Sequence, residues 1–254
     1  MDLKYFEQWV LKEFSIDLSA YKSNQLHRRI LTLMSRVGAK SVDDYISMLK
    51  KSSEQRQKFL DYITINVTEF YRNPEIFKEL DSFIKGSLNH SRPLKIWSAA
   101  CSIGAEPYSI AMMLKEMSPS VRHKIIATDI DNTILQRAKE GLYIEVDVKN
   151  VPGYQLDKYF IKKDSKYLIK NEIKEMVSFK KHDLILDNYE CNFDIIICRN
   201  VVIYFNNEVK EKMYEKFSNS LNKGGLFFIG ATESIYNYKK YNFEKLSTFI
   251  YKKI

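Results

Sequence analysis

The fold is decided by residues 94–112, which read LKIWSAACSIGAEPYSIAM. The run LKIWS is short, apolar and rich in strand-forming residues, and residues 108–117 continue as a helix-like stretch. Between them lie small residues, which let the backbone turn tightly and approach a ligand closely. This stretch predicts a strand, a tight turn and a helix, in that order.

Three further strand-like runs follow along the chain. They are residues 124–128 (KIIAT), 193–198 (FDIIIC) and 225–230 (GLFFIG). Helix-like stretches follow the first two of these, at residues 131–139 and 209–221. Alternation of strands and helices predicts a mostly parallel sheet with helices on both faces, and continuous apolar strands agree with burial on both sides. We therefore expect an α/β domain.

The first part of the chain, to about residue 90, has a different pattern. Four short segments carry apolar residues at helical spacing, and no strand-like run lies between them. In the second segment the apolar stripe ends at Gly38, and Ser41 is placed to cap the third. We predict a small all-α domain over residues 1–75, followed by the α/β domain over residues 76–254. The irregular, polar stretch at about residues 144–180 is interpreted as an inserted small β-subdomain.

Composition bounds the class of protein. Apolar residues make up 45% and charged residues 28%, as in an ordinary soluble globular protein, and there is no apolar run of about eighteen residues. The start lacks a signal-peptide core, and the spacing of Cys101, Cys191 and Cys198 fits neither a disulfide framework nor a zinc site. We expect a cytoplasmic protein without a metal. The net charge of +8 permits an acidic partner but does not choose one.

The residues that follow each strand are candidates for a binding site, because ligands of open parallel sheets bind beyond the carboxyl ends of the strands. Glu106 follows the first strand. A carboxylate there would repel a pyrophosphate and attract an ammonium group, although a simple tight turn with a favourable helix dipole remains an equal alternative. Asp129 follows the second strand and could bind ribose hydroxyls, whereas Asp131 is placed as a helix N-cap.

Other polar residues occupy similar places. Asp183 follows the strand-like run VSFKK and could accept a hydrogen bond from an adenine amino group, or could be a solvated loop acid. Arg199 and Asn200 follow the buried run FDIIIC, where a functional reason is favoured. Tyr204 lies in an apolar stretch, and its hydroxyl needs a partner if it is buried.

With these segments identified, the chain resembles the CheR family of chemotaxis receptor methyltransferases over nearly its whole length. The resemblance rests on five segments in order: NVTEFYRN (66–73), WSAACSIGAEPYSIAM (97–112), ATDID (127–131) with LQRAKEGLY (135–143), FDIIICRNVVIYF (193–205) and GGLFFIGATES (224–234). It implies a helical domain before a Rossmann-like methyltransferase domain that carries a small β insertion. It also implies transfer of a methyl group from S-adenosylmethionine to receptor glutamates, giving methyl esters and S-adenosylhomocysteine.

The resemblance also implies roles for individual residues. Glu106 matches the residue that holds the methionine part of the cofactor, and Asp129 matches the acid on its ribose. Arg72 and Tyr204 would line the methyl-transfer site as catalytic residues. The full set of implied cofactor residues is Asn66, Thr68, Arg72, Ala100, Glu106, Asp129, Asp183, Leu184, Arg199 and Asn200.

Three departures from the family pattern stand out. Ala105 replaces the first of two usual glutamates, and Asp183 stands where the family often has Asn. The insertion is short around residues 162–168, where some members bind a tethering peptide of the receptor. We therefore expect altered electrostatics in the turn before Glu106 and altered contacts with adenine. Binding of a tethering peptide is in doubt for this protein.

A basic stripe is the candidate for substrate recognition. There is no acidic residue between Asp17 and Asp43, and Lys22, Arg29 and Arg36 recur every seven residues, so they share a helix face. A solvated face is the alternative, but the family uses this helix to meet its receptor, and receptor helices are acidic. We predict that Lys22, Arg28, Arg29 and Arg36 bind the cytoplasmic helical region of the receptors. We expect no nucleic-acid partner, no membrane insertion and a monomer.

The predicted reaction needs no general base, because a glutamate acceptor is already ionised at neutral pH. Two other classes remain as alternatives. A nucleic-acid methyltransferase would carry an Asn/Asp-Pro-Pro-aromatic loop or paired catalytic cysteines, and CRNVVIYF occupies the relevant strand end instead. A signalling module that has lost catalysis is the other alternative, for which Ala105 is the one indication.

Overall fold

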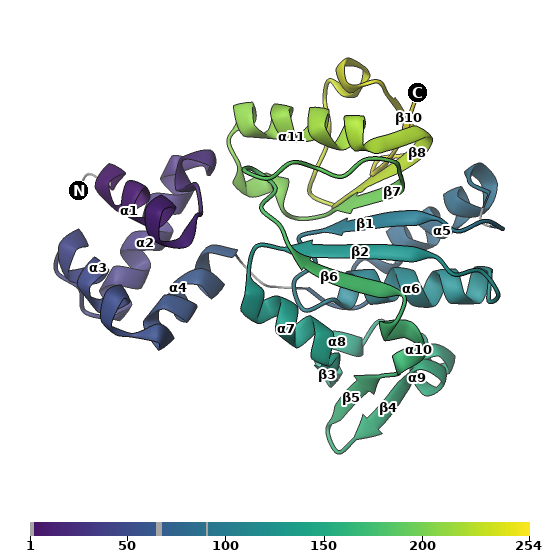
Figure 1. Ribbon diagram of the computed structural model, residues 1–254, viewed down its shortest axis with the longest axis horizontal. Helices are drawn as coiled ribbons and strands as arrows, with labels where there is room; N and C mark the ends of the chain where they lie inside the picture. Colours follow the sequence, from purple (N-terminus) through teal and green to yellow (C-terminus); the bar gives the residue numbers. More distant parts are fainter. Residues whose placement is uncertain (1–2, 65–67, 90) are drawn as a thin grey trace. The chain divides into compact units, whose positions relative to one another are not determined.

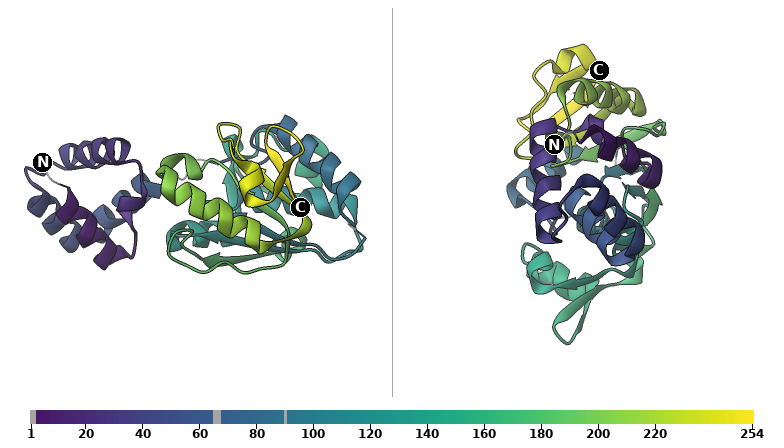
Figure 2. Two further views of the ribbon diagram at one scale, coloured as in Figure 1. Left: turned by 90° about the horizontal axis from the view of Figure 1, so that it is seen from above. Right: turned by 90° about the vertical axis from the view of Figure 1, so that its left-hand side faces the viewer.

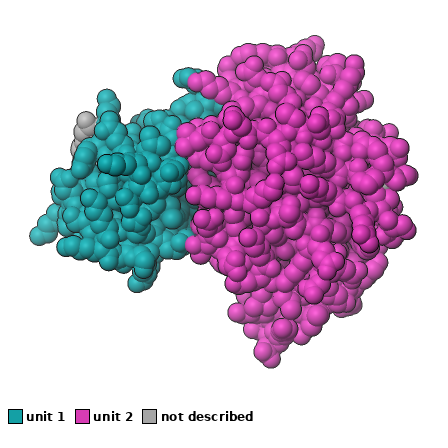
Figure 3. Space-filling view, in the orientation of Figure 1, with its two compact units in different colours: residues 1–66, 204–210 teal, residues 67–203, 211–254 magenta. Residues whose placement is uncertain are grey.

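The computed structural model describes residues 3–64, 68–89 and 91–254 (Figure 1). The chain forms two compact units, which Figure 3 colours separately. The smaller consists of Met1–Asn66 with Tyr204–Lys210, and the larger of Val67–Ile203 with Glu211–Ile254. The sequence interpretation placed the boundary after residue 75 instead. Residues just before it belong to the larger unit because Phe70 and Tyr71 are buried in its core.

The smaller unit is built from helices. These are α1 (Lys4–Phe14), the short 3₁₀ helix η1 (Leu18–Ala20), α2 (Ser23–Arg36), α3 (Val42–Lys51) and α4 (Ser53–Thr64). As the periodicity predicted, Leu26, Ile30 and Leu33 of α2 are buried. Ser41 caps α3 by accepting a hydrogen bond from the amide of Asp44 at 3.1 Å. The all-α prediction for this part is confirmed.

A segment from far along the chain completes the smaller unit. The amide of Lys22 donates to the carbonyl of Tyr204 at 2.9 Å, and the amide of Asn206 donates to the carbonyl of Ala20 at 2.9 Å. Between these bonds the rings of Tyr21 and Phe205 meet edge to face, with centroids 5.0 Å apart. The start of α2 is therefore held by residues that follow a strand of the other unit.

The larger unit contains a seven-stranded sheet in the order β6-β2-β1-β7-β8-β10-β9. Its strands are β1 (Lys95–Ala99), β2 (Lys124–Asp129), β6 (Val177–Lys181), β7 (Phe193–Cys198), β8 (Leu221–Ile229), β9 (Phe243–Lys245) and β10 (Ile250–Lys253). The first five in this order are parallel, and β10 runs antiparallel to both of its neighbours. The predicted mostly parallel sheet is confirmed.

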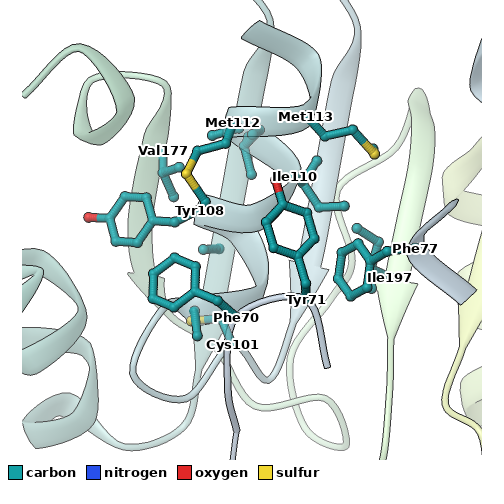
Figure 4. Packing of buried hydrophobic residues seen from close by; sticks show 14 of the residues in the cluster. Phe70, Tyr71, Phe77, Cys101, Tyr108, Ile110, Met112, Met113, Val177 and Ile197 are labelled. Atoms are coloured by element: carbon teal, nitrogen blue, oxygen red, sulfur yellow. The ribbon is translucent and has the colours of Figure 1, made fainter. Parts of the chain in front are cut away.

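Helices cover both faces of this sheet. They are α5 (Pro74–Ser87), α6 (Ala105–Met117), α7 (Asn132–Glu140) and α11 (Asn207–Ser220). Seen from above in Figure 2, the C-terminal strands lie between α11 and α5. Ile197 of β7 packs in the same cluster as Tyr108 of α6 and Phe77 of α5 (Figure 4). Trp97 of β1 faces the other way, and its ring lies 5.5 Å from that of Phe217 in α11.

A second, smaller sheet follows α7. It has the order β3-β5-β4, with antiparallel pairing of β3 (Leu142–Ile144), β4 (Phe160–Lys163) and β5 (Lys166–Ile169). Short helices α8 (Glu145–Val148), α9 (Gly153–Tyr159) and α10 (Asn171–Lys174) accompany it. The predicted extent of about 144–180 reaches too far, because β6 pairs with β2 in the main sheet.

The remaining elements are the 3₁₀ helices η2 (Val202–Tyr204) and η3 (Tyr238–Tyr241). None of the helices in the described ranges is long and apolar enough to cross a membrane.

Candidate active site

The turn between β1 and α6 is unusual in its backbone. The φ values of Ala100, Ser102 and Gly104 are 60°, 51° and 83°. They lie in the left-handed region, which residues other than glycine rarely adopt. A Cβ atom on Gly104 would lie 3.0 Å from that of Ala138, so a side chain here would require α7 to move by a few tenths of an ångström. The turn aims the amide of Ser102 at the carboxylate of Asp129, 2.8 Å away.

Asp129 lies at the end of β2 and is 5% exposed. One of its carboxylate oxygens accepts from the amide of Ser102, and the other accepts from the amide of Asp131 at 3.1 Å. Burial raises the pKa of Asp129 to about 6, while these hydrogen bonds act in the opposite direction. An ionised carboxylate has about four acceptor positions, so Asp129 retains capacity for ligand hydroxyls.

Glu106 lies in the first turn of α6 and is also buried. The hydroxyl of Ser98 donates to its Oε1 at 2.7 Å, and Nη1 of Arg199 lies 3.6 Å from its Oε2. Burial raises the pKa of Glu106, and the Arg199 charge opposes the rise. The carboxylate is therefore held in one orientation at the end of β1.

Arg199 joins the end of β7 to the segment before α5. Its Nη2 donates to the carbonyl of Arg72 at 2.7 Å and to Oδ1 of Asn73 at 3.1 Å. The guanidinium carbon lies 5.1 Å from the ring centre of Phe77 and 4.8 Å from that of Phe228. Burial lowers the pKa of Arg199, and Glu106 opposes that effect. The backbone of Arg72 is thus fixed to the strand ends by this side chain.

Asn200 begins the turn after β7 with φ of 59°. Its amide donates to Oε2 of Glu233 at 2.9 Å, and the amides of Val201 and Gly230 donate to the same carboxylate at 3.1 and 2.6 Å. Sequence reasoning missed Glu233. The signal was available, since the acid follows Gly230 at the end of an apolar run, in the way that Asp129 ends KIIATD.

Asp183 lies just after β6. Its Oδ1 accepts from the amides of Ile185 and Leu186 at 2.7 and 3.2 Å, while its Oδ2 is buried and has no hydrogen-bond partner in the described part of the chain. Leu184 is buried, and its carbonyl accepts from the hydroxyl of Tyr189 at 2.7 Å. Leaving a buried acceptor unpaired costs free energy, so an added hydrogen-bond donor at Oδ2 would be stabilising.

The structure brings most of the predicted cofactor residues to one edge of the sheet. Ala100, Glu106, Asp129, Asp183, Leu184, Arg199 and Asn200 follow the carboxyl ends of β1, β2, β6 and β7, which are neighbours in the sheet. Thr68 is half-buried in the same unit and precedes Arg72 by four residues. Asn66, also predicted, lies outside the described residues. Tyr204 belongs to the smaller unit, where it lines a small cavity with Lys22 and Arg29.

The basic residues of α2 differ in their surroundings. Lys22, Arg28 and Arg36 are exposed, whereas Arg29 is half-buried. The guanidinium carbons of Arg29 and Arg36 lie 4.4 and 5.4 Å from the ring centre of Tyr62 in α4. Nε of Arg29 is buried and has no partner within the described ranges. Arg29 therefore contributes to packing between α2 and α4 as well as to the charge of the helix.

Two family models match the chain. Residues 66–251 match that of the CheR methyltransferase, SAM binding domain, and residues 1–64 match that of the CheR methyltransferase, all-alpha domain. A chemotaxis protein methyltransferase of Listeria innocua is 38% identical over 252 residues, which cover 98% of this chain and 96% of the relative. The chemotaxis protein methyltransferase of Escherichia coli is 30% identical over 237 residues, covering 89% of this chain and 82% of the relative.

Solved structures of methyltransferases also align with part of the chain. A TehB-like SAM-dependent methyltransferase from Corynebacterium glutamicum aligns at 13% identity over 70% of this chain and 94% of its own, with a TM-score of 0.39. That score is too low to add to the assignment, which rests on the family models and the relatives.

Proposed function

We propose that this protein esterifies glutamate side chains of methyl-accepting chemotaxis receptors. The chain belongs to the CheR methyltransferase family, and the proposal starts from that membership. Membership makes the chain an S-adenosylmethionine-dependent methyltransferase of chemotaxis. The acceptor and the residues of the site are the parts that we propose. The observation that supports the site best is a row of buried carboxylates at successive strand ends: Glu106, Asp129 and Asp183.

The residues present fit the cofactor. Each carboxylate corresponds to a donor group of S-adenosylmethionine. Glu106 would hold the ammonium of the methionine part, Asp129 the two ribose hydroxyls, and the unpartnered Oδ2 of Asp183 the adenine amino group. The positive φ values of Ala100 and Ser102 bring bare backbone to the same edge, where it would approach the ligand closely.

The cofactor supplies an electrophilic methyl group on a sulfonium. The chain has to align an acceptor carboxylate with it, which is worth roughly 7–11 kcal/mol when the geometry is close to that of attack. Arg72 would orient that carboxylate by charge-assisted hydrogen bonds, because its backbone is anchored by Arg199. Tyr204 would contribute a hydroxyl near the acceptor. No proton has to be removed from an ionised glutamate, so the residues need only bind, orient and exclude water.

The exposed basic residues of α2 support an acidic receptor segment as substrate. Lys22, Arg28 and Arg36 present their charges to solvent, where they would steer the cytoplasmic helical region of a receptor toward the enzyme. Arg29 would add charge from its place beside Tyr62. In this role the enzyme would act in the cytoplasm, as a monomer, on this region of the receptor.

The experiment is transfer of radiolabelled methyl groups from S-adenosylmethionine to receptor-containing membranes. We expect label in the receptor that base releases as methanol, because carboxyl esters are base-labile. Label in nucleic acid, label in protein that resists base, or no transfer at all would each overturn the proposed acceptor. Membranes from cells without receptors are the matched control and should take up no base-labile label.

A further inference from the structure

We infer that Glu233 is a positioning residue for cofactor binding, which fixes the turn Arg199–Val201 through hydrogen bonds from backbone amides. The inference rests on the proposed function to the extent that Arg199 and Asn200 are taken as cofactor residues. Glu233 itself touches neither the reacting atoms nor, in this role, the cofactor. It acts through the turn.

The carboxylate of Glu233 bridges two neighbouring strand ends. Glu233 is 5% exposed and follows β8, whereas Asn200 follows β7, the adjacent strand in the sheet. Its Oε2 accepts from the amides of Asn200 at 2.9 Å and of Gly230 at 2.6 Å, and its Oε1 accepts from the amide of Val201 at 3.1 Å. Hydrogen bonds to an ionised acceptor are stronger than neutral ones, so three of them on one buried side chain define the position of the turn.

The turn needs such support. Asn200 has φ of 59°, a conformation that persists in a residue with a side chain only where the surroundings hold it. Its side-chain oxygen is buried and has no partner among the residues that the structure describes. The backbone amide is therefore held by Glu233, while the side-chain oxygen remains available to a ligand donor. Glu233 thus positions the backbone of Asn200 and leaves the side-chain oxygen of Asn200 in place for a ligand.

Gly230 fits the same arrangement from the opposite side. A Cβ atom added there would lie 2.7 Å from the amide nitrogen of Asn200 and 2.7 Å from Oε2 of Glu233. Real Cβ atoms do not approach backbone atoms so closely, so any side chain at this position would displace the turn. Two residues of the segment GATES (230–234) therefore act on Asn200. Glu233 binds its amide, and Gly230 leaves room for it because it has no side chain.

The test compares Glu233→Gln and Gly230→Ala with wild type. Gln keeps the shape but places an NH₂ group against a backbone N–H donor, and Ala pushes the turn directly. Both variants should bind S-adenosylhomocysteine about tenfold to a hundredfold more weakly by calorimetry and raise the KM for S-adenosylmethionine, with the KM for receptor unchanged. Ser234→Ala, which alters the exposed neighbour of Glu233, is the matched control and should bind as wild type does.

Two further measurements separate positioning from folding and from the site assignment. If the variants lower the melting temperature yet bind the product as tightly as wild type, Glu233 is merely structural and the inference is overturned. Asn200→Ala tests the proposed site. If Asn200→Ala binds as wild type does, the site assignment fails. If it binds weakly, its effect should not add to that of Glu233→Gln in the double variant, and full additivity would overturn the inference alone. Should Glu233→Gln not fold, Gly230→Ala carries the same comparison.

Discussion

The guanidinium of Arg199 and the carboxylate of Glu106 form a buried pair, with Nη1 and Oε2 3.6 Å apart. The pair ties the end of β7 to the first turn of α6, and Arg199 extends the link to the carbonyl of Arg72. A buried carboxylate beside an arginine stays ionised more readily than one buried alone. Arg199 therefore fixes the orientation of the carboxylate that, in the proposed function, would meet the ammonium of the cofactor.

Binding of the cofactor should depend on the ionisation of Asp129. Burial raises the pKa of Asp129 to about 6, so the carboxyl loses its charge as the pH falls through that value. A protonated carboxyl accepts fewer hydrogen bonds from ribose hydroxyls. Affinity for S-adenosylhomocysteine should be full at about pH 8 and fall progressively toward about pH 5, as measured by calorimetry. Asp129→Asn should bind weakly and lose most of this dependence, whereas constant wild-type affinity over this range would contradict the assignment.

The same shift has the opposite consequence for stability of the cofactor-free protein. The folded-state pKa of Asp129 lies above the ordinary value of 3.8, so the folded protein binds more protons than the unfolded chain between the two values. The contribution of Asp129 to the free energy of unfolding is therefore greatest below the ordinary pKa and is lost as the pH rises through about 6.

Asp183→Asn should change which base the site prefers. In the wild type, Oδ1 is occupied by backbone amides and Oδ2 is a buried acceptor without a partner in the described ranges. An Asn that keeps its oxygen on those amides would present a donor to the base. We expect wild type to favour S-adenosylhomocysteine over S-inosylhomocysteine, in which an oxo group replaces the adenine amino group. Asp183→Asn should reduce that preference by about tenfold or more in competition binding, and an unchanged preference would exclude this contact.

Tyr204→Phe should lower kcat more than it changes affinity for the cofactor. The substitution removes only the hydroxyl, and the ring that lines the cavity beside Lys22 and Arg29 remains, so the melting temperature should stay close to that of wild type. Loss of one hydrogen bond that acts in the transition state corresponds to about a tenfold or greater decrease in rate. Initial rates at saturating S-adenosylmethionine give the comparison, with Tyr236→Phe at a largely exposed position as the control. Full activity in Tyr204→Phe would refute the catalytic role.

Charge reversal on α2 should affect the receptor and leave the cofactor alone. Arg28→Glu and Arg36→Glu alter exposed side chains, so the KM for receptor should rise several-fold, more so at low salt, while affinity for S-adenosylhomocysteine stays constant. Lys12→Glu makes the same change of charge on α1 and should have a smaller effect. Arg29→Glu is a poorer test, because loss of its packing on Tyr62 would also lower stability. If Arg36→Glu and Lys12→Glu gave the same receptor kinetics, only the net charge of the protein would matter, and the role of α2 in recognition would be refuted.

The layers of the fold could be predicted because apolar periodicity is a local property of the chain. The continuous runs at residues 124–128 and 193–198 became buried parallel strands, and the stripe through Leu26 and Ile30 became the inner face of α2. The limits of the small sheet were harder to predict. The run VSFKK carries no signal that distinguishes a strand of the insertion from one that pairs with β2, since pairing is decided by tertiary contacts.

The site was predictable where chemistry follows a strand in sequence, as it does for Asp129. Contacts between distant segments were not. The residues next to Arg199 in the sequence do not predict that its guanidinium lies over Phe77 and Phe228. They also do not predict that it donates a hydrogen bond to the carbonyl of Arg72. Likewise, the burial of Arg29 depends on Tyr62 from another helix. Such side chains acquire their environment from packing, which residue spacing does not encode.

The bonds from Tyr204 and Asn206 to the start of α2 limit how this protein can be divided. A fragment that ends at Asn66 would expose the amide of Lys22 and the carbonyl of Ala20, together with the part of the Tyr21 ring that contacts Phe205. Recombination that exchanges the helical unit between relatives must therefore carry residues 204–210 along, although they are encoded far downstream. Although the helical unit is compact, residues 1–66 alone are therefore not a complete unit for gene fusion or domain exchange.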